Sequence, residues 1–296
     1  MWFCSTMKQR LKSTLKRFLL GDAKSLTDPV LFHRVSLIAF FAWVGLGADG
    51  LSSSTYGPEE AFLALGSHPS LAIFVALLSA FTIFVLSKSY SQIVEAFPLG
   101  GGGYHVATKL LSPFWGMVSG CALLIDYVLT IAISVAAGTA AIFSFLPIEW
   151  HSLKLFFAVV GVLFLTLINL RGVKESIFFI TPVFFVFIIT HLFLLGYAFF
   201  AHFSDFSLLA QSTATDLGNA YGELALIGMF FLIMKAYTLG AGTYTGIEAV
   251  SNGMPLFRQP QVETAKKAMR YMSISLIVAV VGLTVAYLLY HVTPVS

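Results

Sequence analysis

The stretch Gly45-Leu-Gly47-Ala-Asp49-Gly50 decides the fold expected for this chain, because it places three glycines and an acid inside a long apolar run. A second stretch, Gly240-Ala-Gly242-Thr243-Tyr244-Thr245-Gly246, interrupts a later apolar run in a comparable way. Each glycine weakens a helix interior by roughly 1 kcal/mol relative to alanine. Both runs are therefore predicted to be broken helices. Glycines that serve only packing or a kink are the alternative interpretation.

The composition predicts that these runs lie in a membrane. Hydrophobic residues make up 58% of the 296 residues and charged residues 10%, whereas soluble domains average roughly 45–50% and about 25%. A soluble fold of this length could not bury so much apolar surface. The apolar runs are continuous over about twenty residues, which predicts an all-α integral membrane protein rather than a β-barrel.

Apolar runs and helix breakers predict seven membrane spans. The spans are 35–64, 69–90, 114–145, 153–170, 176–200, 224–257 and 272–291. The two interrupted stretches fall five spans apart, in the first and sixth, so the second copy begins on the opposite side of the membrane. This relation is typical of inverted repeats with broken helices 1 and 6. We therefore expect a first five-helix repeat over 35–200, an extracellular loop over 201–223, and the start of a second repeat, helices 6 and 7, over 224–296.

The distribution of Lys and Arg predicts the orientation. Fifteen of the 17 basic residues lie on the side that includes the N-terminus, Lys154 lies on the other side, and Lys235 lies inside a span. Positive charge accumulates on the cytoplasmic side of a membrane. The N-terminus is therefore expected in the cytoplasm, with the basic amphipathic segment 1–34 along the inner leaflet. A disordered basic tail is the alternative for that segment, and the net charge of +3 gives no indication of a nucleic-acid partner.

Four ionisable residues are expected near the middle of the spans, namely Asp49, Asp126, Lys235 and Glu248. Charges inside a hydrocarbon core about 30 Å thick are costly and mark functional positions. Three acids and one base leave a surplus of negative charge, which favours a bound cation and a shared proton. Structural salt bridges are the alternative, above all for Lys235 and Glu248.

The third predicted span carries a polar stripe. Asp126, Tyr127, Thr130 and Ser134 fall within one quarter of the helix surface at 100° per residue. Such a stripe faces protein or water rather than lipid. His191 in the fifth span is a candidate proton site, although a buried histidine with satisfied hydrogen bonds is the simpler interpretation.

Signatures of an enzyme are missing from the sequence. It contains no Gly-x-Ser-x-Gly, no His-Glu-x-x-His and no Walker lysine, and its seven histidines are scattered. Cys4 and Cys121 are too far apart in sequence to indicate a disulfide or zinc framework. An integral-membrane enzyme is therefore the less favoured class, and no cofactor is expected.

Longer motifs resemble the amino acid–polyamine–organocation (APC) superfamily of permeases. They are Phe97-Pro-Leu-Gly-Gly-Gly-Gly-Tyr104, Asn169-Leu-Arg-Gly-Val-Lys-Glu-Ser176 and Thr245-Gly-Ile-Glu-Ala-Val-Ser-Asn-Gly253. Within the superfamily the chain is most similar to KimA-type potassium importers of the KUP branch. The stretches that carry this similarity are Lys16–Gly21, Ala48–Gly57, Leu124–Thr130 and the sixth-span motif. The resemblance implies an APC/LeuT-type fold that imports potassium by proton symport across the cytoplasmic membrane, and it leaves a homodimer open.

The resemblance also implies which residues bind the ion. Its ligands would be Asp49, Tyr56, Asp126, Tyr127, Thr130 and Thr245. Lys235 and Glu248 would serve as coupling or structural charges, and no transition metal is implied. The helix-break backbone would be Gly45, Gly47, Gly50, Gly240 and Gly242.

An amino-acid permease of the same fold is the alternative function. In such a permease the helix breaks bind the substrate carboxylate through backbone N–H groups. An ionised Asp49 beside that position would repel a carboxylate, which argues for a cation.

Length is where the chain departs from the APC pattern. The superfamily core has ten helices in two five-helix repeats, whereas this sequence contains seven predicted spans. We therefore expect a truncated chain in which the remainder of the second repeat is absent.

Overall fold

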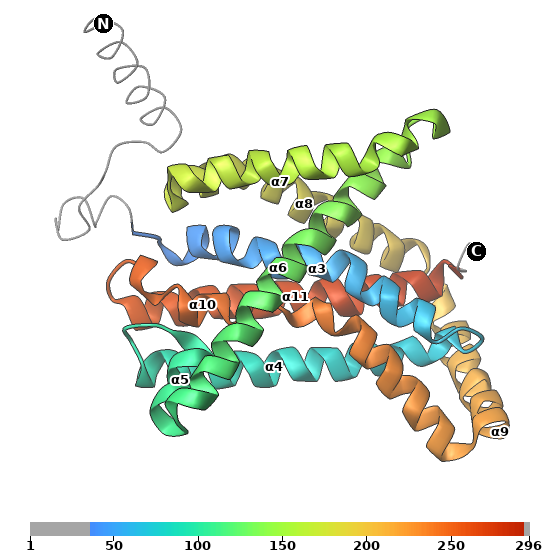
Figure 1. The fold of residues 1–296 in the computed structure, drawn as a ribbon. Coiled ribbons are helices and arrows are strands. Elements are labelled where there is room, and N and C mark those ends of the chain that lie inside the picture. The colour runs from blue at the N-terminus through green and yellow to red at the C-terminus, as the bar shows by residue number, and fades with distance from the viewer. Residues whose placement is uncertain (1–35, 293–296) are drawn as a thin grey trace, which may run out of the picture.

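The computed structural model describes residues 36–292, which form a bundle of long helices (Figure 1). The predicted amphipathic segment 1–34 lies outside the described residues. The long helices are α3 (Ala39–Ala64), α4 (Ala72–Ala96), α6 (Pro113–Phe143), α7 (Lys154–Arg171), α8 (Val173–Ala201), α9 (Phe206–Leu239) and α11 (Gln261–Leu289). The short helical elements are η1 (Pro69–Leu71), α5 (Gly102–Leu110), η2 (Ile148–Leu153), η3 (Phe203–Asp205), η4 (Gly240–Tyr244), α10 (Ala249–Asn252) and η5 (Met254–Leu256).

The predicted all-α membrane class is confirmed. Within residues 36–292, six helical segments are long and apolar enough to cross a membrane, one fewer than the seven spans predicted. The predicted span that is not among these six is α3, which has 26 residues but carries Asp49 and the hydroxyl run Ser52–Thr55. Because α3 packs against α11, α8 and η4, much of its surface faces protein and does not need to be apolar.

The helix break predicted in the first span is wrong, because α3 is continuous through it. The hydroxyls of Ser52 and Ser53 donate to the carbonyl of Asp49 at 2.7 and 3.2 Å, and that of Ser54 donates to the Leu51 carbonyl at 2.7 Å. These side chains therefore bond back onto the preceding turn of the helix, which accommodates them without opening.

The glycines of α3 serve close packing rather than a break. A Cβ at Gly45 would lie 2.5 Å from the Ile177 side chain of α8, and one at Gly50 would lie 3.2 Å from the carbonyl oxygen of Thr245. A Cβ at Gly47 would lie 3.3 Å from the sulfur of Met272. Burial of the neighbouring side chains against these positions offsets the low helix propensity of glycine.

The break predicted in the sixth span is confirmed. After α9 the chain tightens into η4, Thr245 is extended with φ −65° and ψ 154°, and the helix resumes at α10. Gly246 has a φ of +87°, a left-handed conformation that residues with a Cβ rarely adopt.

The loop expected over 201–223 is instead mostly helical. It contains η3 and the first half of α9, which bends at Ala225, where φ is 54° and ψ is 175°. Its Ser, Thr and Asp residues suggested a loop, but Leu209, Leu217 and Ala220 form an apolar face that packs in a cluster with Leu71. Tertiary packing therefore stabilises a helix whose polar composition alone does not indicate one.

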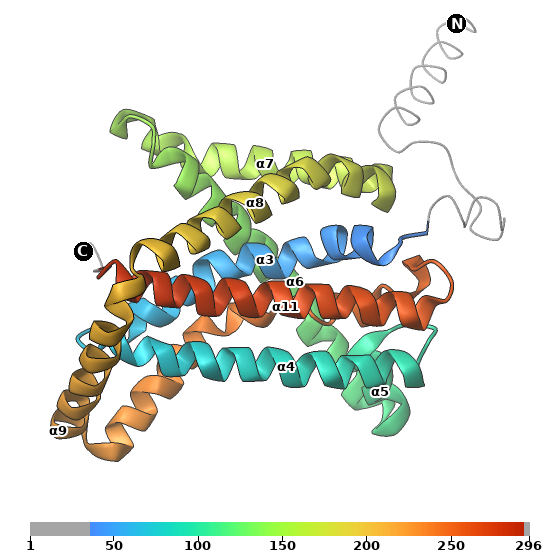
Figure 2. The same ribbon diagram turned by 180° about the vertical axis from the view of Figure 1, so that it is seen from behind.

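The core of the bundle is organised around α11, which lies between α3 and α4 in Figures 1 and 2. Met272 and Leu276 of α11 are fully buried, and Val44 of α3 and Ile83 of α4 belong to the same apolar cluster. By contrast, α6 and α7 leave most of their large apolar side chains exposed, as expected for helices in contact with lipid.

The close approach of α3 to η4 predicts the effect of Gly57→Ala. The new Cβ would lie 2.1 Å from Oγ1 of Thr243 and 3.2 Å from the carbonyl oxygen of Gly240. We expect the substitution to destabilise the fold by about 1–3 kcal/mol through overpacking, measured as a lower thermal unfolding midpoint of the purified protein in detergent.

Gly196→Ala in α8 is the matched control, because nothing lies within 4 Å of a Cβ at that position. We expect it to change stability by less than about 1 kcal/mol. Equal loss of stability in the two variants would contradict the proposed packing contact.

Candidate functional site

The centre of the candidate site is Gly246, in the break between η4 and α10. A Cβ on Gly246 would lie 2.8 Å from Oδ2 of Asp49, so the carboxylate of α3 lies directly against this backbone. The N–H of Gly246 donates to Oε1 of Glu248 at 3.2 Å. Asp49 and Glu248 thus approach one glycine from two different elements, and the absence of a side chain there makes room for them.

Asp126 of α6 completes a group of three acids. It lies within electrostatic range of both Asp49 and Glu248, which also interact with each other. The structure therefore brings together three acids that are 77 and 122 residues apart in sequence. Three carboxylates in a partly buried site concentrate negative potential where lipid and protein exclude most water.

A chain of hydroxyl groups joins α3 to the helix break. The Tyr56 and Ser53 hydroxyl oxygens are 2.8 Å apart, and Ser53 Oγ is 3.4 Å from Oγ1 of Thr245. Thr245 in turn donates to the Gly242 carbonyl at 2.8 Å. Ser53 is fully buried, and the sequence analysis did not single it out. Its spacing, four residues after Asp49 and three before Tyr56, is the signal that would have placed it on the same helix face.

The polar stripe of α6 faces protein, as predicted. Tyr127 accepts a hydrogen bond from Nδ2 of Asn252 at 2.9 Å, which ties the stripe to α10. About two turns further along, the Ser134 and Ser52 hydroxyl oxygens are 3.4 Å apart. Thr130 lies between these two contacts and is buried.

Two of the longer sequence motifs meet beside this site. A Cβ on Gly102 would lie 2.1 Å from Oδ1 of Asn252 and 2.8 Å from the Ser251 hydroxyl oxygen. Gly100, Gly101 and Gly102 all have positive φ values, which lets the chain turn tightly into α5. The glycine-rich motif therefore packs against α10, and Asn252 is a polar residue of the site that sequence reasoning did not select.

A cavity of about 560 Å³ leads away from the hydroxyl chain between α3, α6 and α8. Its α3 wall includes Ser52, Thr55, Tyr56 and Glu59, and His191 of α8 lies at its edge. The Nδ1 atom of His191 is 2.8 Å from the Phe187 carbonyl oxygen within the same helix. The cavity provides space for a small solute next to Tyr56.

Lys235 does not join the three acids. Its side chain is exposed and lines a separate cavity of about 460 Å³ together with His68 and Glu223. The lysine therefore does not offset the negative charge around Gly246, which differs from the charge balance expected from the sequence.

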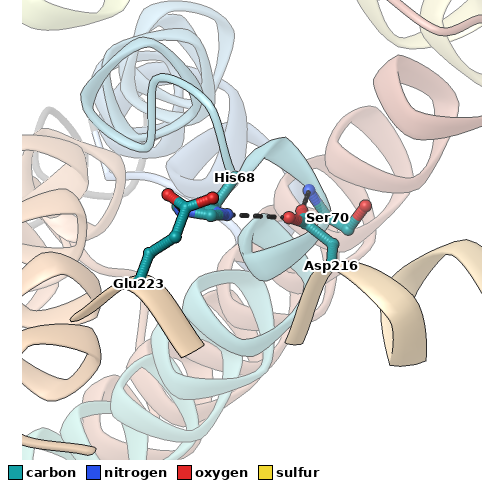
Figure 3. A network of polar contacts seen from close by, with 4 residues as sticks. All are labelled: His68, Ser70, Asp216 and Glu223. Atoms are coloured by element: carbon teal, nitrogen blue, oxygen red, sulfur yellow. Dashed lines mark hydrogen bonds and ion pairs between the residues drawn. The ribbon is translucent and has the colours of Figure 1, made fainter. Parts of the chain in front are cut away.

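A second polar network lies beside that separate cavity (Figure 3). Nδ1 of His68 is 2.8 Å from Oδ1 of Asp216, and the Ser70 N–H donates to Oδ2 of Asp216 at 3.0 Å. Nε2 of His68 is 3.4 Å from Glu223, whose side chain is 65% exposed. The network ties the first half of α9 to the turn before α4. Sequence reasoning missed it because its partners are about 150 residues apart and 201–223 was expected to be a loop.

The network predicts the effect of Asp216→Asn. The substitution retains the shape of the side chain but removes its charge and one acceptor, which leaves buried His68 with a weaker partner. We expect a loss of about 1–3 kcal/mol in the free energy of unfolding, measured as a lower unfolding midpoint. Thr215→Ala, at an exposed position whose hydroxyl bonds only the Gln211 carbonyl, is the control and should change little. A smaller effect for Asp216→Asn than for the control would contradict a structural role for this network.

Comparison with known proteins shows the family to which the chain belongs. The family model described as amino acid permease matches residues 35–294. The chain belongs to the amino acid permease family. It is also 32% identical over 285 residues to the potassium transporter KimA of Bacillus subtilis (strain 168), an alignment that covers 95% of this chain. The chain spans about half the length of that relative, with 46% covered.

Membership of this family places the chain among the membrane permeases of the APC superfamily, which are transporters and not enzymes. The break after α9 and the acids around it lie inside the region matched by the family model. The resemblance noted in the sequence motifs is therefore confirmed at the level of the family.

Proposed function

We propose that the chain binds potassium beside Gly246 and takes part in the import of this ion by proton symport. The observation that carries the proposal is the approach of Asp49 and Glu248 to the helix break, with Asp126 within electrostatic range of both and Lys235 lining a different cavity. A net negative site at membrane depth favours a cation over an anion. The similarity to a protein named as a potassium transporter supports this choice of ion.

The neutral oxygens around the acids suit a monovalent ion. Potassium sites in channels use carbonyl oxygens that replace the hydration shell of the ion. The hydroxyl oxygens of Tyr56, Ser53 and Thr245 form a comparable set of uncharged oxygen ligands. The helix break also exposes backbone carbonyls that a continuous helix would use internally. The site therefore offers both kinds of ligand that a large, weakly hydrated cation needs.

The number of carboxylates supports coupling to protons. Three like charges in a medium of low dielectric repel one another strongly. One monovalent cation compensates one of these charges, and a proton compensates another. A site that changes its exposure only when both charges are compensated would carry the ion and the proton together, which is the linkage that a symporter requires.

An amino-acid substrate is less consistent with the same geometry. Permeases of this fold type bind a substrate carboxylate with backbone N–H groups at a helix break. In this chain the Gly246 N–H already donates to the Glu248 carboxylate. A substrate carboxylate would have to displace Glu248 and approach Asp49, so both contacts oppose it.

The proposal predicts that Asp49→Asn and Asp126→Asn each reduce potassium uptake more than tenfold, because each removes a negative charge from the site. Uptake of radioactive rubidium by bacterial cells that lack their own potassium importers and express the protein measures this. Membrane abundance of each variant is measured in parallel by immunoblotting.

Glu60→Gln is the control on the same helix, since Glu60 is exposed and contacts neither the cavity beside Tyr56 nor the helix break. It should retain uptake close to that of the unmodified protein. Uptake that is unchanged in both aspartate variants, at normal abundance, would overturn the site.

Direct binding distinguishes potassium from amino acids. Potassium or rubidium chloride should raise the unfolding midpoint of the purified chain relative to choline chloride, because a ligand that binds the folded state stabilises it. The shift should disappear in Asp49→Asn. A shift with a mixture of amino acids that does not depend on potassium would favour the amino-acid permease instead.

We further propose that the protein lies in the plasma membrane with its N-terminus in the cytoplasm. This orientation applies to a monomer and to a homodimer alike. The starts of α3, α6 and α11 lie at one end of the bundle in Figures 1 and 2, and most of the basic residues in the described part of the chain belong to helix ends and loops on that side. Because positive charge favours the cytoplasmic side, this end is assigned to the cytoplasm.

The orientation predicts the activity of alkaline phosphatase fusions, since this enzyme is active only outside the cytoplasm. A fusion after Ser152, between α6 and α7, should be active, and one after Gly101, between α4 and α5, should be inactive. The reverse pattern would contradict the orientation without affecting the ion site.

A further inference from the structure

We propose that a cavity between α4 and α11 binds the phosphate headgroup of an anionic phospholipid. The cavity has a volume of about 450 Å³ and lies away from the three acids. Its polar wall includes Lys88, Glu95, Lys266 and Arg270. Neither the family match nor the transport of an ion requires such a site.

The cavity carries more positive charge than its own acid can balance. Lys266 forms an ion pair with Glu95. In the part of the chain that the structure describes, Lys88 and Arg270 have no carboxylate within ion-pair distance. Two cations of one cavity are therefore available to an anion.

The start of α11 adds to this positive potential. Lys266 and Arg270, the two basic residues of α11 that line the cavity, both lie in its first three turns, with Glu263 as the acid of the first turn. The N-terminus of a helix already carries a partial positive charge, so basic residues are unfavourable there unless an anion lies nearby. A bound phosphate would relieve this repulsion.

The length of the two helices places the cavity at the level of lipid headgroups. The segment Pro69–Ala96 has 28 residues and α11 has 29, which correspond to about 42 Å each at 1.5 Å per residue. The hydrocarbon core is about 30 Å thick, so about eight residues of each helix extend beyond it in total, about four at each end. Lys88 and Arg270 then lie about one turn inside the border between hydrocarbon and headgroups, a depth from which long basic side chains reach the headgroups.

The wall also contains uncharged polar side chains and, on the side away from Glu95, three apolar side chains that favour a lipid over a free phosphate. Phe84 and Ile274 are 52% and 56% exposed and lie one turn deeper than the cations, next to Ile277. The ammonium of Lys88 lies 5.7 Å from the centre of the Phe84 ring. A phospholipid would place its phosphate on the cations and an acyl chain on these side chains. Basic pockets between membrane helices on the cytoplasmic side are suited to such headgroups.

The experiment compares three probes on the purified full chain in detergent. Short-chain phosphatidylglycerol should raise the thermal unfolding midpoint in a saturable manner, whereas phosphatidylcholine of the same chain length and inorganic phosphate should not. In Lys88→Gln/Arg270→Gln, the concentration of phosphatidylglycerol needed for half of the effect should rise at least tenfold.

Lys109→Gln/Lys267→Gln is the matched control, because it removes the same charge at this end of the molecule from residues outside the cavity. It should keep the response, and the charge-conserving Lys88→Arg/Arg270→Lys should restore most of it. Equal responses to phosphatidylglycerol and phosphatidylcholine, or equal losses in the two glutamine variants, would overturn the site. A response to inorganic phosphate equal to that to phosphatidylglycerol would also overturn the lipid site, because it would show a site for any phosphate anion.

A measurement on the unmodified protein guards against variants that do not fold. Photoreactive phosphatidylglycerol should label peptides from 84–95 and 266–277, as identified by mass spectrometry, and unlabelled phosphatidylglycerol should compete. Labelling confined to other helices would also overturn the proposal.

Discussion

The close approach of α3 to the broken segment after α9 is the contact on which the rest of the structure depends. Gly57 meets the side chain of Thr243, and Gly50 meets the carbonyl of Thr245, at separations that leave no room for a Cβ. Small residues allow helices in membranes to approach closely, where van der Waals packing rather than the hydrophobic effect stabilises them. This approach places Asp49 beside Gly246 and Ser53 beside Thr245.

The contact between α3 and the broken segment also explains how acidic side chains can be accommodated within membrane-spanning helices. Asp49, Asp126 and Glu248 would be costly if they faced lipid. Asp49 and Glu248 lie against a helix break instead, where the Gly246 N–H replaces part of the lost hydration of Glu248. The left-handed Gly246 supplies both the space for Asp49 and the N–H that Glu248 binds. Local backbone geometry and the proposed ion site therefore depend on the same residue.

The charges of the chain divide between two regions with different roles. Acids gather around the break in the middle of the bundle, and basic residues gather at the end where α4 finishes and α11 begins. The first region suits a cation in transit, and the second suits an anionic lipid surface. The exposed Lys235 belongs to neither, because the bend of α9 at Ala225 directs that part of the helix toward His68.

The sequence by itself determined the membrane class, most helix boundaries and the break at Gly240–Gly246, and it supplied the three acids of the proposed site, because these follow from local composition, glycine and charge. Only the tertiary structure decided that α3 is continuous, since packing against Met272 and Ile177 outweighs the low helix propensity of its glycines. It likewise decided that 201–223 is mostly helical, that Ser53 and Asn252 join the site and that Lys235 does not. Each of these depends on which surfaces meet, and contacts between residues far apart in the chain leave no local pattern to detect.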